Sequence, residues 1–240
     1  HPHPATPDAQ ESRGLGDVYK RQVLDIGCGW GGMALEIAKQ TGAKVKGITL
    51  SENQFATASK RAQDEGLSDR VSFQIQDYRD EKGRYDGIAS IEMFEAVGQK
   101  YWPVYFETIK NCLHPGRQAT LQIITVQDAR WEVYQRGVDF IQKYIFPGGM
   151  LPSPNALKAE VQNAGLSVVK SKEFGLSYSQ TLRRWHDVFN AKWDQAAALG
   201  FDDRFRRMWN FYLTSCAATF ESGNCDVTQI TIANSGGSKA

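Results

Sequence analysis

The chain has 240 residues, of which 41% are hydrophobic and 11% aromatic, enough for one well-packed domain with an elaboration. Its 28 basic and 27 acidic side chains leave a net charge of +1, which argues against the broad basic surface of a nucleic-acid-binding protein. The four cysteines form no CxxC pair and no histidines stand at ligand spacing, so we expect no disulfide framework, no metal site and a reduced cytoplasmic compartment.

The first half of the chain alternates strands with helices. Residues 1–22 lack periodicity, and we expect an unstructured or foreign leader there. Apolar runs then predict strands at Val23–Ile26, Val45–Leu50, Val71–Ile75, Asp86–Ile91 and Ala119–Val126. Helical spacing predicts helices at Met33–Gln40 (buried face Met33, Ile37 and Ala38), Glu52–Glu65 (capped by Ser51) and Tyr101–Cys112. This alternation predicts an α/β fold with a parallel, doubly wound sheet.

The second half changes rhythm after the fifth strand. Helices are predicted at Arg130–Ile145 and Pro154–Ala164, with strands at Leu166–Val169 and Val227–Ile232. Two amphipathic helices precede the last strand. The first carries a stripe of Tyr178, Leu182, Trp185, Phe189 and Trp193, and the second carries Phe201, Phe205, Met208, Trp209, Tyr212 and Cys216. We expect residues 233–240 to be a disordered tail.

A glycine-rich turn follows the first strand directly. Gly27-x-Gly29-x-x-Gly32 opens the first helix, a pattern shared by several kinds of nucleotide-binding enzyme, although a tight turn without a ligand has the same pattern. Asp25 would set a carboxylate close to the pyrophosphate of a dinucleotide. S-adenosylmethionine has no phosphate, and its ammonium and sulfonium groups are cations that a carboxylate attracts. The charge argument therefore favours S-adenosylmethionine.

The later strand ends add polar candidates for the same ligand. The stretch GITLSENQ has no acidic residue where a dinucleotide's ribose would need one. Thr49 and Gln54 could instead hold ribose hydroxyls or the methionine end, and Asp77 could meet the adenine or ribose edge. An ordinary strand-end threonine, an exposed helix glutamine and a turn aspartate are equally good interpretations of these three residues.

Eight motifs in order carry a family resemblance: VLDIGCGWGG, GITLSENQ, QDYRD, MFEAVG, YWPVYF, KYIFPGGMLPS, FGLSYSQTL and FYLTSCAATF. Together they resemble the cyclopropane-fatty-acyl-phospholipid synthase family, which uses S-adenosylmethionine to methylate unsaturated acyl chains of membrane lipids. The resemblance implies a Rossmann-like class I methyltransferase domain at 23–232, with helical cap elements at about 127–165 and 178–220 inserted after the fifth strand. It also implies a cofactor site comprising Asp25, Gly27, Cys28, Gly29, Gly31, Thr49, Gln54, Asp77, Tyr78 and Ile91.

The resemblance also implies a bound bicarbonate that removes a proton. Its ligands carry over to Glu95, to the backbone at Ile124 and to Tyr178. Gln122 stands where the family has a histidine, and the family's N-terminal arm has no counterpart in the leader. Cys216 matches a cysteine near the family's active site, while its place on the apolar stripe is also that of a buried structural thiol.

Glu92, three residues before Glu95, suggests a different base. It lies where many family members have a small residue, in an apolar stretch where an ionised carboxylate is expensive to bury. We hypothesise that Glu92 brings its own carboxylate into the place of bicarbonate, among Glu95, Gln122 and Tyr178. The alternative is a solvated loop residue or a salt-bridge partner.

The substrate raises the question of membrane contact. No apolar run approaches the ~20 residues of a membrane span. Arg183 and Arg184 beside Trp185, and Arg204, Arg206 and Arg207 beside Trp209, combine basic and aromatic side chains as interfacial helices do, although solvated arginines around a core stripe are the other interpretation. By resemblance we expect a cytoplasmic enzyme, peripheral at the inner face of the membrane and homodimeric. Two rival functions stay open: methylation of a small soluble molecule, and S-adenosylmethionine binding without turnover.

Overall fold

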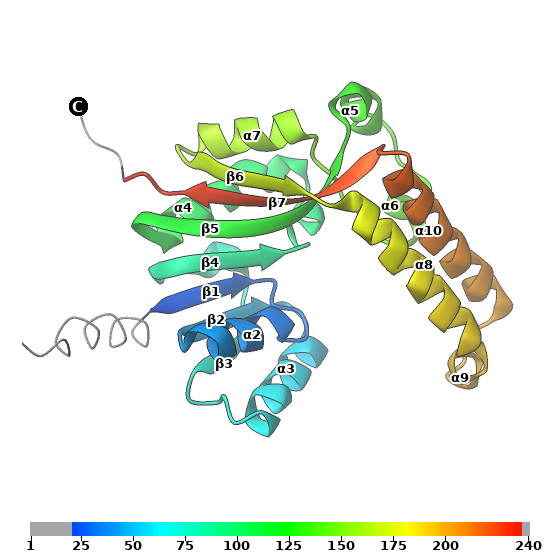
Figure 1. Cartoon of the computed structure of the whole chain (residues 1–240), viewed down its shortest axis with the longest axis horizontal. Helices are drawn as coiled ribbons and strands as arrows, with labels where there is room; N and C mark the ends of the chain where they lie inside the picture. Colours follow the sequence, from blue (N-terminus) through cyan, green and yellow to red (C-terminus); the bar gives the residue numbers. More distant parts are fainter. Residues whose placement is uncertain (1–20, 237–240) are drawn as a thin grey trace, which may run out of the picture.

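A computed structural model describes residues 21–236 and is built on one seven-stranded sheet (Figure 1). The strands are β1 (Gln22–Ile26), β2 (Lys44–Thr49), β3 (Val71–Ile75), β4 (Tyr85–Ile91), β5 (Leu113–Val126), β6 (Ser167–Glu173) and β7 (Cys225–Ala233). Their order across the sheet is β3-β2-β1-β4-β5-β7-β6. The pairs among β1 to β5 are parallel, whereas β7 runs antiparallel to both β5 and β6. The carboxyl ends of five parallel strands therefore meet at one edge, where ligands bind in open α/β sheets.

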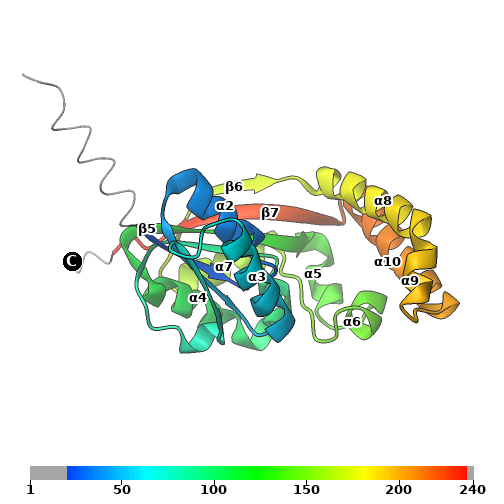
Figure 2. The same cartoon turned by 90° about the horizontal axis from the view of Figure 1, so that it is seen from below.

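Helices cover the sheet and extend beyond it. They are α2 (Gly32–Thr41), α3 (Glu52–Asp64), α4 (Trp102–Cys112), α5 (Asp128–Tyr134), α6 (Phe140–Tyr144), α7 (Pro154–Asn163), α8 (Gly175–Ala191), α9 (Trp193–Ala198) and α10 (Asp203–Glu221). Three short 3-10 turns are η1 (Tyr78–Asp80), η2 (Phe94–Ala96) and η3 (Gln99–Tyr101). Helices α2 and α3 pack on β2 and β3, and α4 and α7 pack on β5 and β6 (Figures 1 and 2).

The core has one cluster on each face of the sheet because successive strand residues point to opposite faces. Leu24, Ile26 and Ile123 are buried with the α4 aromatic side chains Trp102, Tyr105 and Phe106. Val45, Val71 and Phe73 are buried on the other face against α2 and α3. Phe94 stacks on Trp102 with ring centroids 5.1 Å apart, which anchors the loop after β4 in the larger cluster.

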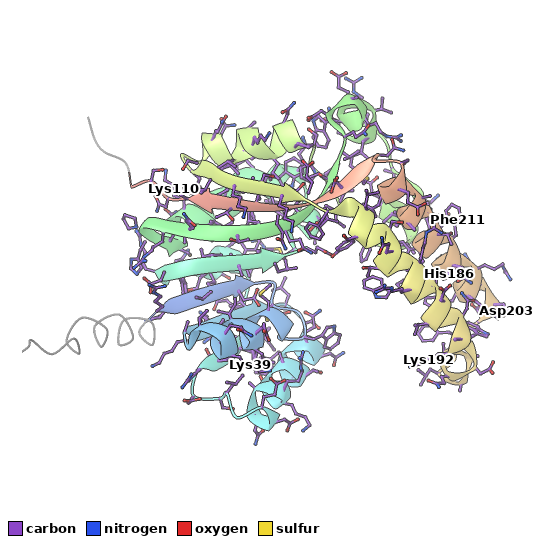
Figure 3. All side chains as sticks on the ribbon, in the orientation of Figure 1. Lys39, Lys110, His186, Lys192, Asp203 and Phe211 are labelled. Carbon is purple, nitrogen blue, oxygen red and sulfur yellow. The ribbon has the colours of Figure 1, made fainter. Side chains whose placement is uncertain are left out.

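A helical hairpin of α8, α9 and α10 projects from the carboxyl edge of the sheet (Figure 2). Lys192, just after α8, and Asp203, at the start of α10, lie at its far end (Figure 3). Leu182, Leu213 and Phe220 are buried between the helices near the sheet. Farther out, Asn190 donates a 2.7 Å hydrogen bond to Asn210, which joins the helices at half-buried positions.

Most predicted elements are confirmed, with several differences. Phe201 lies before α10, which begins at Asp203, and β5 begins at Leu113 rather than at Ala119. The predicted helix at Arg130–Ile145 is wrong: it is two helices, because Asp139 forms a capping box with Gln142 that starts α6 anew. Trp193 belongs to α9 rather than to α8. Met33 is 39% exposed, whereas Ala38 is buried as predicted and Ile37 partly so, and α2 also buries Ala34 and Leu35. The sheet is mixed rather than wholly parallel, since β7 is antiparallel.

The predicted leader and tail fall largely outside the described residues. Within them, Gln22 already belongs to β1 and Ala233 still belongs to β7. Asn234 is buried, and its amide donates to the carbonyls of Lys110 and Leu113, each at 3.1 Å. The ordered sheet therefore includes one residue that we had assigned to each flank.

Candidate functional site

The glycine turn after β1 has a backbone that other residues adopt only with strain. Gly27, Gly29 and Gly31 have φ angles of 73°, 54° and 82°. A Cβ on Gly27 would lie 2.5 Å from the Cγ of Met93, in the loop after β4. The amides of Gly27 and Cys28 both donate to the carbonyl of Ile48 at 3.0 Å. The turn is thus tied to β2 and lies against the loop that carries the two glutamates.

Asp25 presents a buried carboxylate to this turn. The residue is 1% exposed, and its Oδ2 has no hydrogen-bond partner. Burial raises the pKa of the carboxyl from 3.8 to about 7, although the backbone N–H of Ala34 opposes that rise. A buried, unpartnered carboxylate oxygen is costly unless a cation pairs with it. Asp25 therefore fits the cationic S-adenosylmethionine expected from the sequence, and not a pyrophosphate.

The other predicted cofactor residues lie at the carboxyl ends of the neighbouring strands. Thr49, which ends β2, donates to Gln54 Oε1 at 2.7 Å. Asp77 forms a 2.6 Å ion pair with Arg79, whose hydrogen bond lowers the pKa of the Asp77 carboxyl. Tyr78 packs edge-on against Tyr105 at 5.5 Å. The strand order thus brings together residues that are far apart in the sequence.

Two further predicted cofactor residues are Ile91 and Cys28. Ile91 is half-buried at the end of β4. The thiol of Cys28 is buried, and burial raises its pKa to about 12. Cys28 is therefore an unreactive thiol at neutral pH, which leaves its backbone as the part that shapes the turn.

Glu92 has an unusual backbone and two hydrogen-bond donors. Its φ of 51° is the only positive value at a non-glycine position among the residues described. Its Oε1 accepts a 2.7 Å hydrogen bond from Gln122 Nε2 and another from the Tyr178 hydroxyl. Gln122 Nε2 also lies 3.0 Å from the Tyr178 oxygen. Burial raises the pKa of the Glu92 carboxyl above its ordinary value of 4.5, and the hydrogen bond from Gln122 opposes that rise.

Glu95 lies deeper and is held by backbone groups. Its Oε1 accepts a 2.6 Å hydrogen bond from the N–H of Ile124, while its Oε2 is buried without a partner. Burial raises the pKa of this carboxyl from 4.5 to about 7. The backbone carbonyl of Glu95 accepts from the N–H of Met150 at 2.9 Å, which joins its loop to the segment after α6.

These contacts decide whether the site residues fit a bound bicarbonate. The family resemblance assigns Glu95, the Ile124 backbone and Tyr178 to it, with Gln122 at the place of the family's histidine, and every donor among these groups is already used by a carboxylate of this protein. Gln122 and Tyr178 donate to Glu92, and the N–H of Ile124 donates to Glu95. A bicarbonate would have to displace the Glu92 carboxylate, which has the same charge sign, from Gln122 and Tyr178. The residues present therefore do not fit a bound bicarbonate.

A large apolar cavity opens beside the two glutamates. Its volume is about 980 Å³, at the upper end of the range for ligand pockets. Side chains from η2, β5, α5, α6, α8, α10 and β7 and from their connecting loops line it, among them Ile124, Ile141, Met150, Leu182, Tyr212 and Phe220. Glu92, Glu95 and Tyr178 form part of the same lining. The cavity is large and apolar enough to enclose an aliphatic chain beside these polar groups.

Cys216 lies in the wall of this cavity. Burial raises the pKa of its thiol to about 12, and the residue packs in the cluster around Leu182 and Leu213. A thiol that stays protonated at neutral pH is a poor nucleophile. Of the five predicted catalytic residues, the structure therefore joins Glu92, Gln122 and Tyr178 by hydrogen bonds, binds Glu95 to the Ile124 N–H instead, and leaves Cys216 among the apolar lining.

The two predicted membrane-facing groups differ in their exposure. Trp185 is 53% exposed and lines the cavity, while neighbouring Arg183 is paired with Glu221 at 2.5 Å. Trp209 instead stacks on Phe205 at 5.6 Å, within the aromatic packing of the hairpin. The aromatic side chains of the group at Trp209 therefore pack inside the hairpin, which agrees with the alternative interpretation of a core stripe.

The sequence did not point to two residues that contact this site. Gln229 Nε2 donates to Gln122 Oε1 at 3.0 Å from the neighbouring strand β7. Met150 holds the Glu95 loop through its backbone. Met150 lies within the motif KYIFPGGMLPS but was given no role there, and Gln229 lies in no motif: strand register alone makes it the partner of Gln122.

Two absences concern only residues 21–236. Within this range, no group of three or more histidine, cysteine, aspartate or glutamate side chains could hold a metal ion. No helix in the same range is long and apolar enough to cross a bilayer.

Comparison with known proteins places this geometry among lipid-modifying enzymes. A family model described as mycolic acid cyclopropane synthetase matches residues 19–230. The tuberculostearic acid methyltransferase UfaA1 of Mycobacterium tuberculosis is 40% identical over 215 residues, which are 89% of this chain and 50% of that protein. The cyclopropane-fatty-acyl-phospholipid synthase of Escherichia coli K12 is 36% identical over 210 residues, 87% of this chain and 52% of that protein.

Solved structures of cyclopropane synthases have the same fold as this chain. The cyclopropane synthase MmaA2 from Mycobacterium tuberculosis superposes with a TM-score of 0.82 and 27% identity, over 95% of this chain and 85% of that one. The mycolic acid cyclopropane synthase CmaA1, solved with SAH and CTAB, has a TM-score of 0.82 and 25% identity over the same shares. The chain spans about half the length of the curated relatives it matches.

Proposed function

Because the chain belongs to the mycolic acid cyclopropane synthetase family of S-adenosylmethionine-dependent methyltransferases, we propose that it methylates the double bond of an unsaturated acyl chain in a membrane phospholipid. The observation that carries the proposal is the apolar cavity that ends at two carboxylates, next to the glycine turn and Asp25. The relatives modify different lipids: their names include tuberculostearic acid and sphingolipid methyltransferases. The phospholipid substrate and a cyclopropane or methyl-branched product are thus our specific choice.

The proposed cofactor contacts follow from the strand ends. Asp25 would pair with a cationic group of S-adenosylmethionine, and the glycine turn would let the backbone approach it. Thr49, Gln54 and Asp77 would supply polar contacts from the next strands. When bound, S-adenosylmethionine supplies an electrophilic methyl group.

The cavity would perform the first task of catalysis, which is positioning. A carbon–carbon double bond is a weak nucleophile, so it must be held in line with the methyl group, and fixed geometry of this kind is worth ~7–11 kcal/mol. The apolar walls exclude water, which would otherwise capture the carbocation that forms on the acyl chain. Tyr212 and Phe220 in the wall offer aromatic faces that stabilise such a cation by roughly 0.5–2 kcal/mol each.

The second task is removal of a proton, and we assign it to Glu92. In the proposed step the alkene electron pair would form the new bond to the methyl carbon as the bond from that carbon to sulfur breaks, with its electron pair left on sulfur, and the resulting cation would lose a proton to the Glu92 carboxylate. This loss closes a cyclopropane ring if the proton leaves the added methyl group, or leaves a double bond if it leaves the chain. A carboxyl with a raised pKa is a better proton acceptor near neutral pH than an exposed one. Glu95, fixed on Ile124 N–H, shapes the polar end and adds negative charge near the cation.

Access to a bilayer would come through the rim of the cavity. Val133, Phe146 and Trp185 line the cavity and are 78%, 55% and 53% exposed. Exposed apolar side chains around a pocket mouth mark surfaces that meet a membrane or another protein. We therefore place the protein at the inner face of the cytoplasmic membrane, with Arg184 next to this rim. A homodimer remains an expectation from the family.

One experiment tests the proposed function. The protein is incubated with labelled S-adenosylmethionine and mono-unsaturated phospholipid vesicles, and the modified chains are identified by mass spectrometry. The expected result is a chain heavier by one methylene unit. Methylation of a soluble molecule but not of vesicles would support the first rival function. Cofactor binding by calorimetry without any transfer would support the second.

A variant tests the base. Glu92→Gln keeps an oxygen that can accept from Gln122 and Tyr178, but it cannot take a proton. We expect methyl transfer to fall about 10²- to 10⁴-fold, the usual contribution of a general base, with cofactor affinity unchanged. Added bicarbonate should not restore the rate. Full activity of Glu92→Gln that depends on bicarbonate would contradict the assignment.

A further inference from the structure

Gln122 is an ambiguous partner for a catalytic carboxylate because its amide has two different ends. The NH₂ end donates hydrogen bonds, and the carbonyl end only accepts them. Only the NH₂ end stabilises a carboxylate, since the carbonyl end would set two electron-rich oxygens against each other. A histidine can also offer a positive charge at this position, whereas a glutamine depends wholly on its orientation.

Both ends of the Gln122 amide form hydrogen bonds, and these bonds agree on one orientation of the amide. Its Nε2 donates to Glu92 Oε1 at 2.7 Å and lies 3.0 Å from the Tyr178 hydroxyl. Its Oε1 accepts a 3.0 Å hydrogen bond from Gln229 Nε2. The Gln229 donor therefore holds the carbonyl end of Gln122 away from Glu92.

Strand register explains why Gln229 has this role. Gln122 and Gln229 are direct partners in the antiparallel pair β5–β7, so their side chains leave the same face of the sheet next to each other. On the far side of Gln229, its register partner in β6 is Lys172. A lysine ammonium has donors and no acceptor, so it favours the carbonyl end of Gln229 toward itself. The NH₂ end of Gln229 is directed toward Gln122, in agreement with that preference.

We infer that Gln229 is a positioning residue for the proposed proton transfer: it holds the Gln122 amide so that Glu92 receives a donor. It does not touch the substrate region itself, since it is absent from the cavity lining and acts through Gln122. The inference rests on the proposed function. The titratable groups that face Glu92 are Glu95 from its own loop, Tyr178 from α8 and Tyr212 from α10.

The chain offers a matched set of variants on one exposed sheet face. Gln229→Glu replaces the donor with an acceptor of nearly equal shape, which draws the NH₂ end of Gln122 to itself and turns its carbonyl to Glu92. Gln229→Lys restores a donor. Thr231→Glu is the control, because Thr231 lies two residues along β7 and faces Lys170 just as Gln229 faces Lys172. It adds the same charge without reaching Gln122, since Thr231 is opposite Thr120.

Two readouts are measured for each variant. The first is vesicle methyl transfer as a function of pH, and the second is infrared titration of the Glu92 carboxyl, taken as the difference from the same protein with Glu92→Gln. We expect Gln229→Glu to slow transfer about tenfold and to raise the Glu92 pKa by about 1 unit, the size of one lost charge-assisted hydrogen bond. Gln229→Lys should recover most of the rate, and Thr231→Glu should change it less than about twofold.

Three results would overturn the inference. These are a Gln229→Glu protein with the parent rate and Glu92 pKa, a Thr231→Glu protein as slow as Gln229→Glu, and a Gln229→Lys protein that recovers nothing. If the parent protein methylates no lipid, the proposed function fails, while the infrared titration still decides whether Gln229 controls Glu92.

Discussion

In the absence of cofactor, the buried charge of Asp25 should lower the free energy of unfolding at neutral pH. Its carboxyl titrates at about 7 in the folded state, against an ordinary value of 3.8. The folded protein therefore holds a proton that the unfolded chain releases, and the free energy of unfolding falls as pH rises between these two values. A difference of about 3 pKa units corresponds to about 4 kcal/mol at pH 8.

Asp25→Asn removes this pH dependence. The amide keeps an oxygen for the Ala34 N–H, but it places an NH₂ group where Oδ2 has no partner, which costs about 1–3 kcal/mol. We therefore expect the variant to be more stable than the parent by about 2 kcal/mol at pH 8 and less stable at pH 4. Urea unfolding of both proteins without cofactor, across this pH range, should show the two stability curves crossing.

Asp25→Asn should bind S-adenosylmethionine more weakly than the parent, although it is the more stable protein at pH 8. Loss of the carboxylate should weaken S-adenosylmethionine about 100-fold by calorimetry at pH 8, because its cation loses a buried partner. Glu95→Gln is the matched control: the pKa of Glu95 is also about 7 through burial, so the variant should gain stability at pH 8 and keep its cofactor affinity. Curves that do not cross, or an Asp25→Asn protein with parent affinity, would refute the assignment of Asp25 to the cationic cofactor.

Two further predictions concern the loop and the cavity. Glu92→Gly should be more stable than Glu92→Ala by about 1 kcal/mol in urea unfolding, because residue 92 has a φ of 51° that glycine adopts without strain; equal stabilities would mean that the backbone is not strained there. Cys216→Ala should retain vesicle methylation, because a thiol with a pKa of about 12 is not a nucleophile, whereas Cys216→Trp should fill the cavity and abolish methylation while calorimetry shows unchanged cofactor binding. Loss of activity in Cys216→Ala would contradict the structural role.

The sequence alone was sufficient for the fold class and the family. Strand, glycine turn and helix are local patterns, so the run from β1 to α4 could be predicted to within a residue or two at most boundaries. Asp25, Glu95 and Tyr178 lie in motifs whose residues are close in sequence, and the motifs carried the resemblance that the comparisons confirm. Periodicity also indicated the amphipathic helices that enclose the cavity.

Local patterns did not predict where helices break. The predicted helix at Arg130–Ile145 is interrupted because Asp139 captures the backbone N–H of Gln142, and an apolar period does not reveal a cap inside it. The same break creates α6, whose side chains line the cavity. Sequence periodicity therefore did not predict the size of the cavity, which depends on how these helices pack in the tertiary structure.

Only the tertiary structure decided which donor serves which carboxylate. The sequence suggested that Glu92, Gln122 and Tyr178 meet, but not that Glu92 adopts a left-handed backbone or that Glu95 takes the Ile124 N–H. Gln229 and Gln122 are 107 residues apart, and the antiparallel register of β5 and β7 makes them neighbours. Register depends on the packing of the whole sheet, because a shift of one residue would turn either side chain to the other face.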